Sequence, residues 1–297
     1  MRRRYFGASL LALAGCGEPP SAPGASPVSW ELHPVTREGA DWRLVAQSDL
    51  IVRAKVSVLP QSLEDLPPRF VQIPLVVTSV LSGTEDRKTF DFTYYTSRPD
   101  SPSPTEVAKS VSAESIFHLK WIGRSPAAPA GAYFFAGYQP EALVPASAEL
   151  EARIREEAET QRTVATRVEA LLSAHKPPLD RRVASLVDKA LRGNTQAALD
   201  GLLALPNDAL PAMVKRLDDR RPLKQGANSI SIKGVWEFSH YSVVDIGGLM
   251  MFVLHHHGDL KNGYLGWADK DTSERRRERI VAAWRVWLGY SLRLMSN

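Results

Sequence analysis

Three consecutive histidines, His255-His256-His257, form the one cluster in the sequence whose residue types suggest metal chemistry. Imidazole and carboxylate groups are zinc ligands, so His240, His255, His257 and Asp259 could together hold a metal ion that activates water. On a helix, however, consecutive side chains point about 100° apart, and three adjacent rings cannot converge as efficiently as histidines four residues apart. A metal-dependent hydrolase using this region is therefore the alternative function.

The simpler interpretation places these histidines in the last turn of a helix that Gly258 ends. Histidines there can bond to the unpaired carbonyls and interact favourably with the negative end of the helix dipole. We favour this interpretation. The sequence then predicts no metal ligand, no cofactor and no catalytic residue.

A second cluster of chemical interest is a basic run near Trp284 and Trp287 that consists of Arg275, Arg276, Arg277 and Arg279. It could bind anionic lipid or nucleic acid, and at the start of a helix its charge opposes the dipole. Because Glu274 and Glu278 are interleaved, we expect a solvent-exposed face instead, paired with Asp218, Asp219 or Asp269. The two tryptophans have the spacing of a buried helix stripe.

The third chemically notable residue is the single cysteine, Cys16. A basic segment (Arg2 to Arg4) and a short apolar run (YFGASLLALA) precede it, which is the layout of a secretory signal peptide. Leu13-Ala14-Gly15-Cys16 resembles the lipobox of bacterial lipoproteins. The resemblance implies cleavage before Cys16, attachment of diacylglycerol to its thiol, and usually acylation of the new amino terminus.

Processing before Cys16 would change the charge balance and expose a tether. Loss of three arginines from 37 basic residues leaves 34 against 33 acidic ones, so we expect no nucleic-acid partner. Residues 17–29 contain four prolines and should form a semi-rigid tether of about 3.1 Å per residue. Gly17 stands where enteric lipoproteins retained in the inner membrane carry Asp, which favours the outer membrane.

Composition and missing motifs narrow the remaining classes. A chain of 297 residues with 44% hydrophobic residues can build one large or two modest cores. One cysteine rules out an intrachain disulfide scaffold. The sequence contains no G-x-S-x-G, H-E-x-x-H, Walker A or G-x-G-x-x-G motif, which lowers the prior for an enzyme.

Alternating apolar and polar residues predict an N-terminal β domain. The pattern is clearest in residues 48–58, where Leu50, Val52, Ala54 and Val56 share one face. Pro74 suggests an edge position, a bulge or a break in the second strand. The other expected strands are 70–81, 90–95, 115–122 and 132–138, and residues 40–47 read as a short helix.

Five short strands without long intervening helices favour an antiparallel barrel or sandwich. The order SDLIVRAKV, VVTSVLSG, GAYFFAG resembles the netrin-like, OB-type barrels that include the tissue inhibitors of metalloproteases. Those inhibitors act through a free N-terminal cysteine amine packed by disulfides against the barrel. Acylated Cys16 on a tether cannot do the same, so protease inhibition does not carry over.

Helical periodicity dominates after residue 145. Expected helices are 148–174, 179–192, 195–205, 208–217, 242–257 and a last one that starts with a capping-box-like Asp271 and Glu274. Its buried stripe comprises Ile280, Trp284, Trp287, Leu288 and Leu292. The short helices with Gly or Pro corners resemble HEAT-like repeats.

These observations predict an α+β protein: an N-terminal antiparallel β-barrel or sandwich, OB-like, followed by an α-helical domain. The expected division is signal peptide 1–15, Pro-rich tether 16–29, barrel 30–145 and helical domain 146–297. The expected function is that of a non-catalytic binding or assembly lipoprotein in the bacterial cell envelope. Its partners would be the bilayer, through Cys16, and an envelope protein or polymer.

Overall fold

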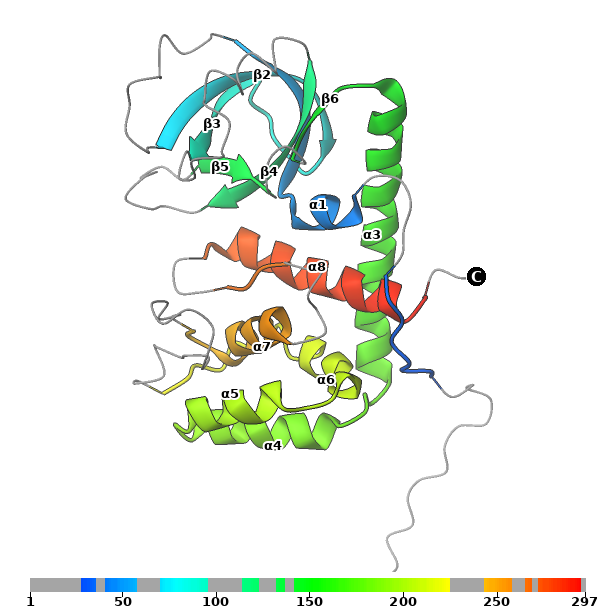
Figure 1. Cartoon of the computed structure of the whole chain (residues 1–297), viewed down its shortest axis with the longest axis vertical. Coiled ribbons are helices and arrows are strands. Elements are labelled where there is room, and N and C mark those ends of the chain that lie inside the picture. Colours follow the sequence, from blue (N-terminus) through cyan, green and yellow to red (C-terminus); the bar gives the residue numbers. More distant parts are fainter. Residues whose placement is uncertain are drawn as a thin grey trace, which may run out of the picture.

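The computed structural model describes residues 28–35, 41–57, 70–95, 114–122, 132–136, 142–224, 243–257, 265–268 and 272–294. It confirms the α+β class, with a closed five-stranded barrel followed by helices. In Figure 1 the barrel occupies the upper part and the short helices the lower part, while the long helix α3 (Ala148–Ala174) runs alongside both.

The barrel is OB-like and closes through a pairing between β1 (Leu50–Val56) and β4 (Ser115–Ile122). Its strand order is β1-β2-β3-β5-β4, with the short β6 added beside β4. Neighbouring strands are antiparallel except for β3 and β5, which pair in parallel at Phe92 and Tyr133. The strands are β1 (Leu50–Val56), β2 (Phe70–Ser82), β3 (Thr89–Tyr95), β4 (Ser115–Ile122), β5 (Ala132–Phe135) and β6 (Leu143–Pro145).

Aromatic side chains fill the barrel. Phe92 stacks edge-on against both Phe117 and Phe135, with ring centroids 5.6 and 5.0 Å apart. Such edge-to-face pairs add about 0.5–1.5 kcal/mol each to the stabilisation from burial. Successive side chains of a strand point to opposite faces, so the apolar residues that alternate with polar ones in the sequence all point into the barrel.

Pro74 does not break β2, contrary to one of the expected outcomes. The last residue pair between β1 and β2 is Val56 with Leu75, so Pro74 lies just beyond the shared ladder. Its carbonyl still accepts a hydrogen bond from the Ser57 amide at 3.0 Å. The ladder with β1 ends next to Pro74, so no bond to β1 needs the amide hydrogen that proline lacks. The edge interpretation is wrong for the strand as a whole, because β2 pairs with both β1 and β3.

The helices follow the expected pattern with shifted ends. The long α3 begins and ends where the sequence predicts, with Ser147 as its N-cap. The helices are α1 (Trp42–Gln47), α3 (Ala148–Ala174), α4 (Asp180–Leu191), α5 (Thr195–Leu203), a 3-10 turn η1 (Asn207–Ala209), α6 (Leu210–Val214), α7 (Ile246–His256) and α8 (Glu274–Ser291). None of the helices in these described ranges is sufficiently long and apolar to cross a membrane.

Two of these helices start differently from the prediction. Helix α7 begins at Ile246, so Gly247 and Gly248 lie in its first turn and not in its middle. A β-carbon on Gly247 would lie 2.2 Å from the Leu217 carbonyl oxygen, so only glycine permits this close approach. Helix α8 is capped by Ser273, whose hydroxyl accepts from the Arg276 amide at 3.3 Å; Asp271 lies outside the described residues.

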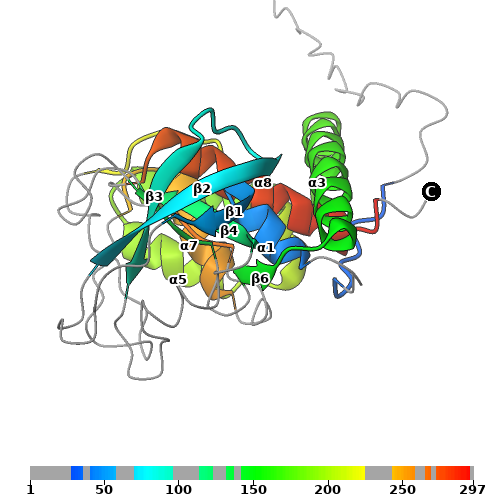
Figure 2. The same ribbon diagram turned by 90° about the horizontal axis from the view of Figure 1, so that it is seen from above.

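Helix α8 is the centre of the helical core, and its predicted stripe is confirmed. Ile280, Trp284, Trp287 and Leu288 are buried, and Leu292 packs against the same cluster. The Trp284 indole donates to the Gly266 carbonyl at 3.1 Å. Gly289 allows α8 to cross α3 closely, because a β-carbon there would lie 2.2 Å from a methyl carbon of Val164. Figure 2 shows α3 beside both the barrel and α8.

The helical core also takes in residues that precede the barrel. Trp42 and Ala46 of α1 are buried in it, and Trp30, Leu32 and Val35 pack against it. The His33 amide donates to the Ser291 carbonyl at the end of α8, at 2.8 Å. Residues 28–35 are called the strap below, because they tie the N-terminal part of the chain to the helical core.

Candidate functional site

The most unusual concentration of charge lies where α8 meets the barrel. We define the junction cluster as Asp49, Lys120, Arg276 and Arg279. Asp49 immediately precedes β1 and Lys120 belongs to β4, while both arginines lie on α8. The contact joins residues more than 220 positions apart, for example Asp49 with Arg276.

The arginines of this cluster anchor α8 to α1 and to Asp49, the residue before β1. Arg276 donates from one terminal nitrogen to the Gln47 carbonyl at 2.6 Å and to Asp49 Oδ2 at 3.2 Å. Arg279 donates to the Val45 carbonyl. The same Asp49 oxygen accepts the Trp121 amide at 2.7 Å. Because the Asp49 side chain is only 1% exposed, its charge is strongly felt by the neighbouring cations.

Two cations of the cluster, Lys120 and Arg279, have pKa values below their usual range. Burial lowers the pKa of Lys120 to about 8, and Arg276 acts in the same direction while Asp49 opposes it. Burial likewise lowers the pKa of Arg279 to about 10. Both side chains therefore remain predominantly charged at neutral pH.

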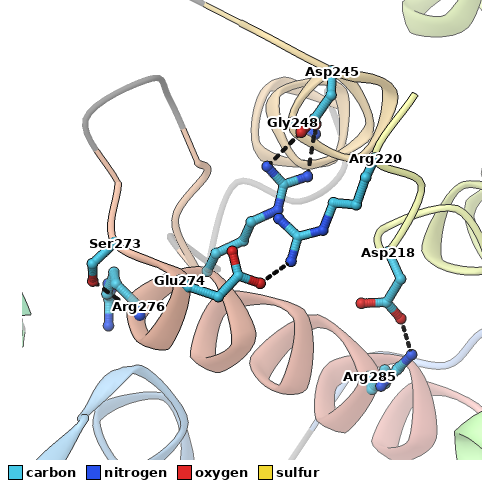
Figure 3. Close-up of polar contacts among 9 residues, drawn as sticks. Asp218, Arg220, Asp245, Gly248, Ser273, Glu274, Arg276 and Arg285 are labelled. Carbon is cyan, nitrogen blue, oxygen red and sulfur yellow. Dashed lines mark hydrogen bonds and ion pairs between the residues drawn. The ribbon is translucent and has the colours of Figure 1, made fainter. Parts of the chain in front are cut away.

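A neighbouring ion pair holds α8 to α7. Arg277 donates to the two carboxylate oxygens of Asp245 at 2.8 and 2.6 Å. Asp245 is also the N-cap of α7, where it accepts the Gly248 amide at 2.8 Å, as Figure 3 shows. The bidentate geometry is the strong form of an arginine–carboxylate contact.

The prediction that the basic run forms a solvent-exposed face is therefore wrong for three of its four arginines. Arg275 is exposed, but Arg276, Arg277 and Arg279 are buried to different degrees and bonded. The expected acidic partners bind elsewhere: Asp218 pairs with Arg285 and Asp219 with Arg221. Asp269 lies outside the described residues. Glu274 pairs across to Arg220, as drawn in Figure 3.

The histidines lie at the C-terminal end of α7, with His255 and His256 in its last turn and His257 at the C-cap, while Gly258 lies outside the described residues. His256 contacts a carbonyl of this helix, whereas His257 contacts one of another segment. His256 Nδ1 lies 2.8 Å from the Phe252 carbonyl, one helical turn earlier. His257 Nε2 lies 3.0 Å from the Leu205 carbonyl near the end of α5. The His255 ring packs on Trp267 at 4.7 Å, and burial lowers the pKa of His255 to about 4.

The structure describes two of the four residues of the alternative metal site, His255 and His257. His240 and Asp259 lie outside the described residues, as does the lipid-attachment residue Cys16. Among the residues that the structure describes, no three His, Cys, Asp or Glu side chains are grouped to hold a metal ion.

Sequence patterns could not locate the junction cluster. Lys120 occupies an outward position of a period-two strand, which ordinarily indicates solvent, and Asp49 looks like a residue at the end of a turn. Only the docking of α8 on the barrel makes these positions interior. Comparison with protein-family models, with curated proteins and with solved structures gives no match in any of the three searches.

Proposed function

We propose that this protein is a lipoprotein of the bacterial cell envelope, anchored through acylated Cys16, whose body is a non-catalytic binding or assembly module. Its partner would be an envelope protein or polymer, and the residue after Cys16 favours the outer membrane. The lipobox and the Pro-rich tether of the sequence supply the anchoring part of this proposal.

The observation that carries the proposal is the docking of the strap on the helical core. The His33 backbone bond to Ser291 and the packing of Trp30, Leu32 and Val35 hold the strap on the helical core, and the proposed tether would start from there. From Val28 back to Cys16, an extended Pro-rich segment would span about 37 Å. A pull on the lipid end would therefore act on the α8 end of the body.

The rigidity of that body supports a binding role. Two contacts join the barrel to the helices, Arg276 with Asp49 and Arg53 with Glu151 of α3, and a third, Arg279 with the Val45 carbonyl, joins α8 to α1. A further buried network joins Tyr290, Glu157 and Gln161 to the Trp42 carbonyl. A body with a fixed shape presents its surface without the entropic cost of ordering two loose parts on binding.

The experiment is site-specific photo-crosslinking in cells, followed by mass spectrometry. The crosslinker replaces Gln72 on the barrel or Arg181 on α4, which are exposed positions on opposite parts of the molecule. We expect at least one position to capture a defined envelope component, and Cys16→Ser to abolish or strongly reduce that capture. Capture that is unaffected by Cys16→Ser would contradict the tethered module. Stoichiometric zinc with hydrolytic activity would also contradict it.

A further inference from the structure

The junction cluster holds more positive charge than the described residues neutralise. Lys120, Arg276 and Arg279 all interact electrostatically with the single carboxylate of Asp49. That carboxylate already accepts hydrogen bonds from Arg276 and from the Trp121 amide. Two of the three cationic charges therefore lack an anionic counterpart in the described part of the cluster.

The cluster also has more hydrogen-bond donors than the described residues provide acceptors for. In the described ranges, the Lys120 side chain makes no hydrogen bond or ion pair, although it is partly buried and its pKa of about 8 leaves it protonated at neutral pH. The Nε of Arg279 is buried and also has no acceptor there. Leaving the buried Arg279 Nε unpaired costs more than the hydrogen bond itself would contribute. The Lys120 ammonium is not buried to the same degree, and it lacks an acceptor while staying open to solvent.

We propose that the junction cluster binds a phosphate-type oxyanion, either free or as part of a lipid headgroup, between β4 and the first turns of α8. A phosphate carries up to two negative charges, which matches the two uncompensated cations, whereas one carboxylate would leave a positive charge over. Its oxygens are strong acceptors for arginine and lysine donors.

The surroundings of the cluster suit such a ligand. The cations lie near the N-terminal end of an 18-residue helix, where the helix dipole also favours negative charge. Lys120 is partly exposed and its Nζ is not among the buried unpaired atoms of the described residues, so the ammonium group can be reached from solvent. Arg275, exposed one residue before Arg276, adds long-range attraction for an anion.

This inference deepens the proposed function by naming a ligand class, and it rests on the body being a binding module. The two can fail separately. Acylation and Cys16-dependent crosslinking test the anchored module in cells, whereas phosphate binding is measured on the purified protein.

The test is isothermal titration of the purified full chain with inorganic phosphate at constant ionic strength, set with sodium chloride. The variants are Lys120→Gln and, as a matched control, Lys55→Gln, since Lys55 is an exposed lysine on another barrel strand. We expect saturable binding by the wild type and by Lys55→Gln, and at least tenfold weaker binding by Lys120→Gln. Lys120→Gln should remain folded, because it removes an unpaired, partly buried charge.

A second arm identifies the source of the phosphate group. Cosedimentation with phosphatidylglycerol vesicles is compared with cosedimentation with pure phosphatidylcholine vesicles. Lys120-dependent binding to free phosphate or to phosphatidylglycerol supports the proposal and shows which source is used. The absence of binding in both arms, or equal binding by wild type and Lys120→Gln, would overturn it.

Discussion

Three neighbouring arginines of α8 should differ sharply in their contribution to stability. Arg277 is 5% exposed and bonds both oxygens of Asp245. Replacing it with alanine leaves the buried Asp245 carboxylate with the Gly248 amide as its remaining hydrogen-bond donor among the described residues, and breaking a buried pair costs about 3–5 kcal/mol. Arg276→Ala removes bonds to the Gln47 carbonyl and Asp49, and we expect a loss of about 1.5–3 kcal/mol. Arg275→Ala, at an exposed position, should cost about 0.5 kcal/mol or less.

The assay is urea unfolding followed by far-UV circular dichroism, which reports the loss of helix. A double-mutant cycle with Arg277→Met and Asp245→Asn isolates the pair itself from the lost packing of the arginine stem. We expect a coupling energy of at least about 1.5 kcal/mol. Equal destabilisation by Arg275→Ala and Arg277→Ala, or a coupling near zero, would refute the placement of α8 against α7.

Three further predictions concern the core and its buried histidine. Trp284→Ala should cost about 3–5 kcal/mol in urea unfolding, because the indole is fully buried and bonded to the Gly266 carbonyl, whereas a near-neutral result would put this helix face outside the core. Gly289→Ala should cost about 1–3 kcal/mol through its clash with Val164, and adding Val164→Ala should restore part of that loss; no recovery would contradict the close α3–α8 crossing. Burial lowers the pKa of His118 to about 4, so the neutral ring is favoured in the fold and stability should fall as pH drops from about 6.5 to 4. His118→Leu should flatten that part of the stability–pH curve, and an unchanged slope would argue against a buried neutral ring.

The sequence predicts elements that a single periodic pattern defines. Strand β4 and helix α3 have the expected bounds, because their patterns run without interruption from one turn signal to the next. The three-residue β6 was not expected, since Leu143–Pro145 is too short for a period and is defined by its pairing with β4. The stripe of α8 follows the 3.6-residue period and is confirmed.

The junction cluster and the start of α7 depend on contacts that no local pattern contains. A run of arginines normally indicates a solvated face, and tertiary packing reverses that meaning here by placing Asp49, Asp245 and backbone carbonyls against α8. In the sequence, the pair Gly247-Gly248 lies inside the predicted helix 242–257, where glycine is destabilising. It lies in the first turn instead, where a side chain on Gly247 would meet the Leu217 carbonyl and the Arg277 guanidinium.

Anchoring through Cys16 is the central functional claim, and the intact mass of the membrane-extracted wild-type protein tests it most directly. The account predicts that the chain starts at Cys16, with the mass of a diacylglycerol group and usually one further acyl chain added to it. It also predicts that Cys16→Ser accumulates as an unprocessed or wrongly processed precursor without acyl label. Recovery of the wild type as a water-soluble protein with an unmodified Cys16 thiol would contradict the account.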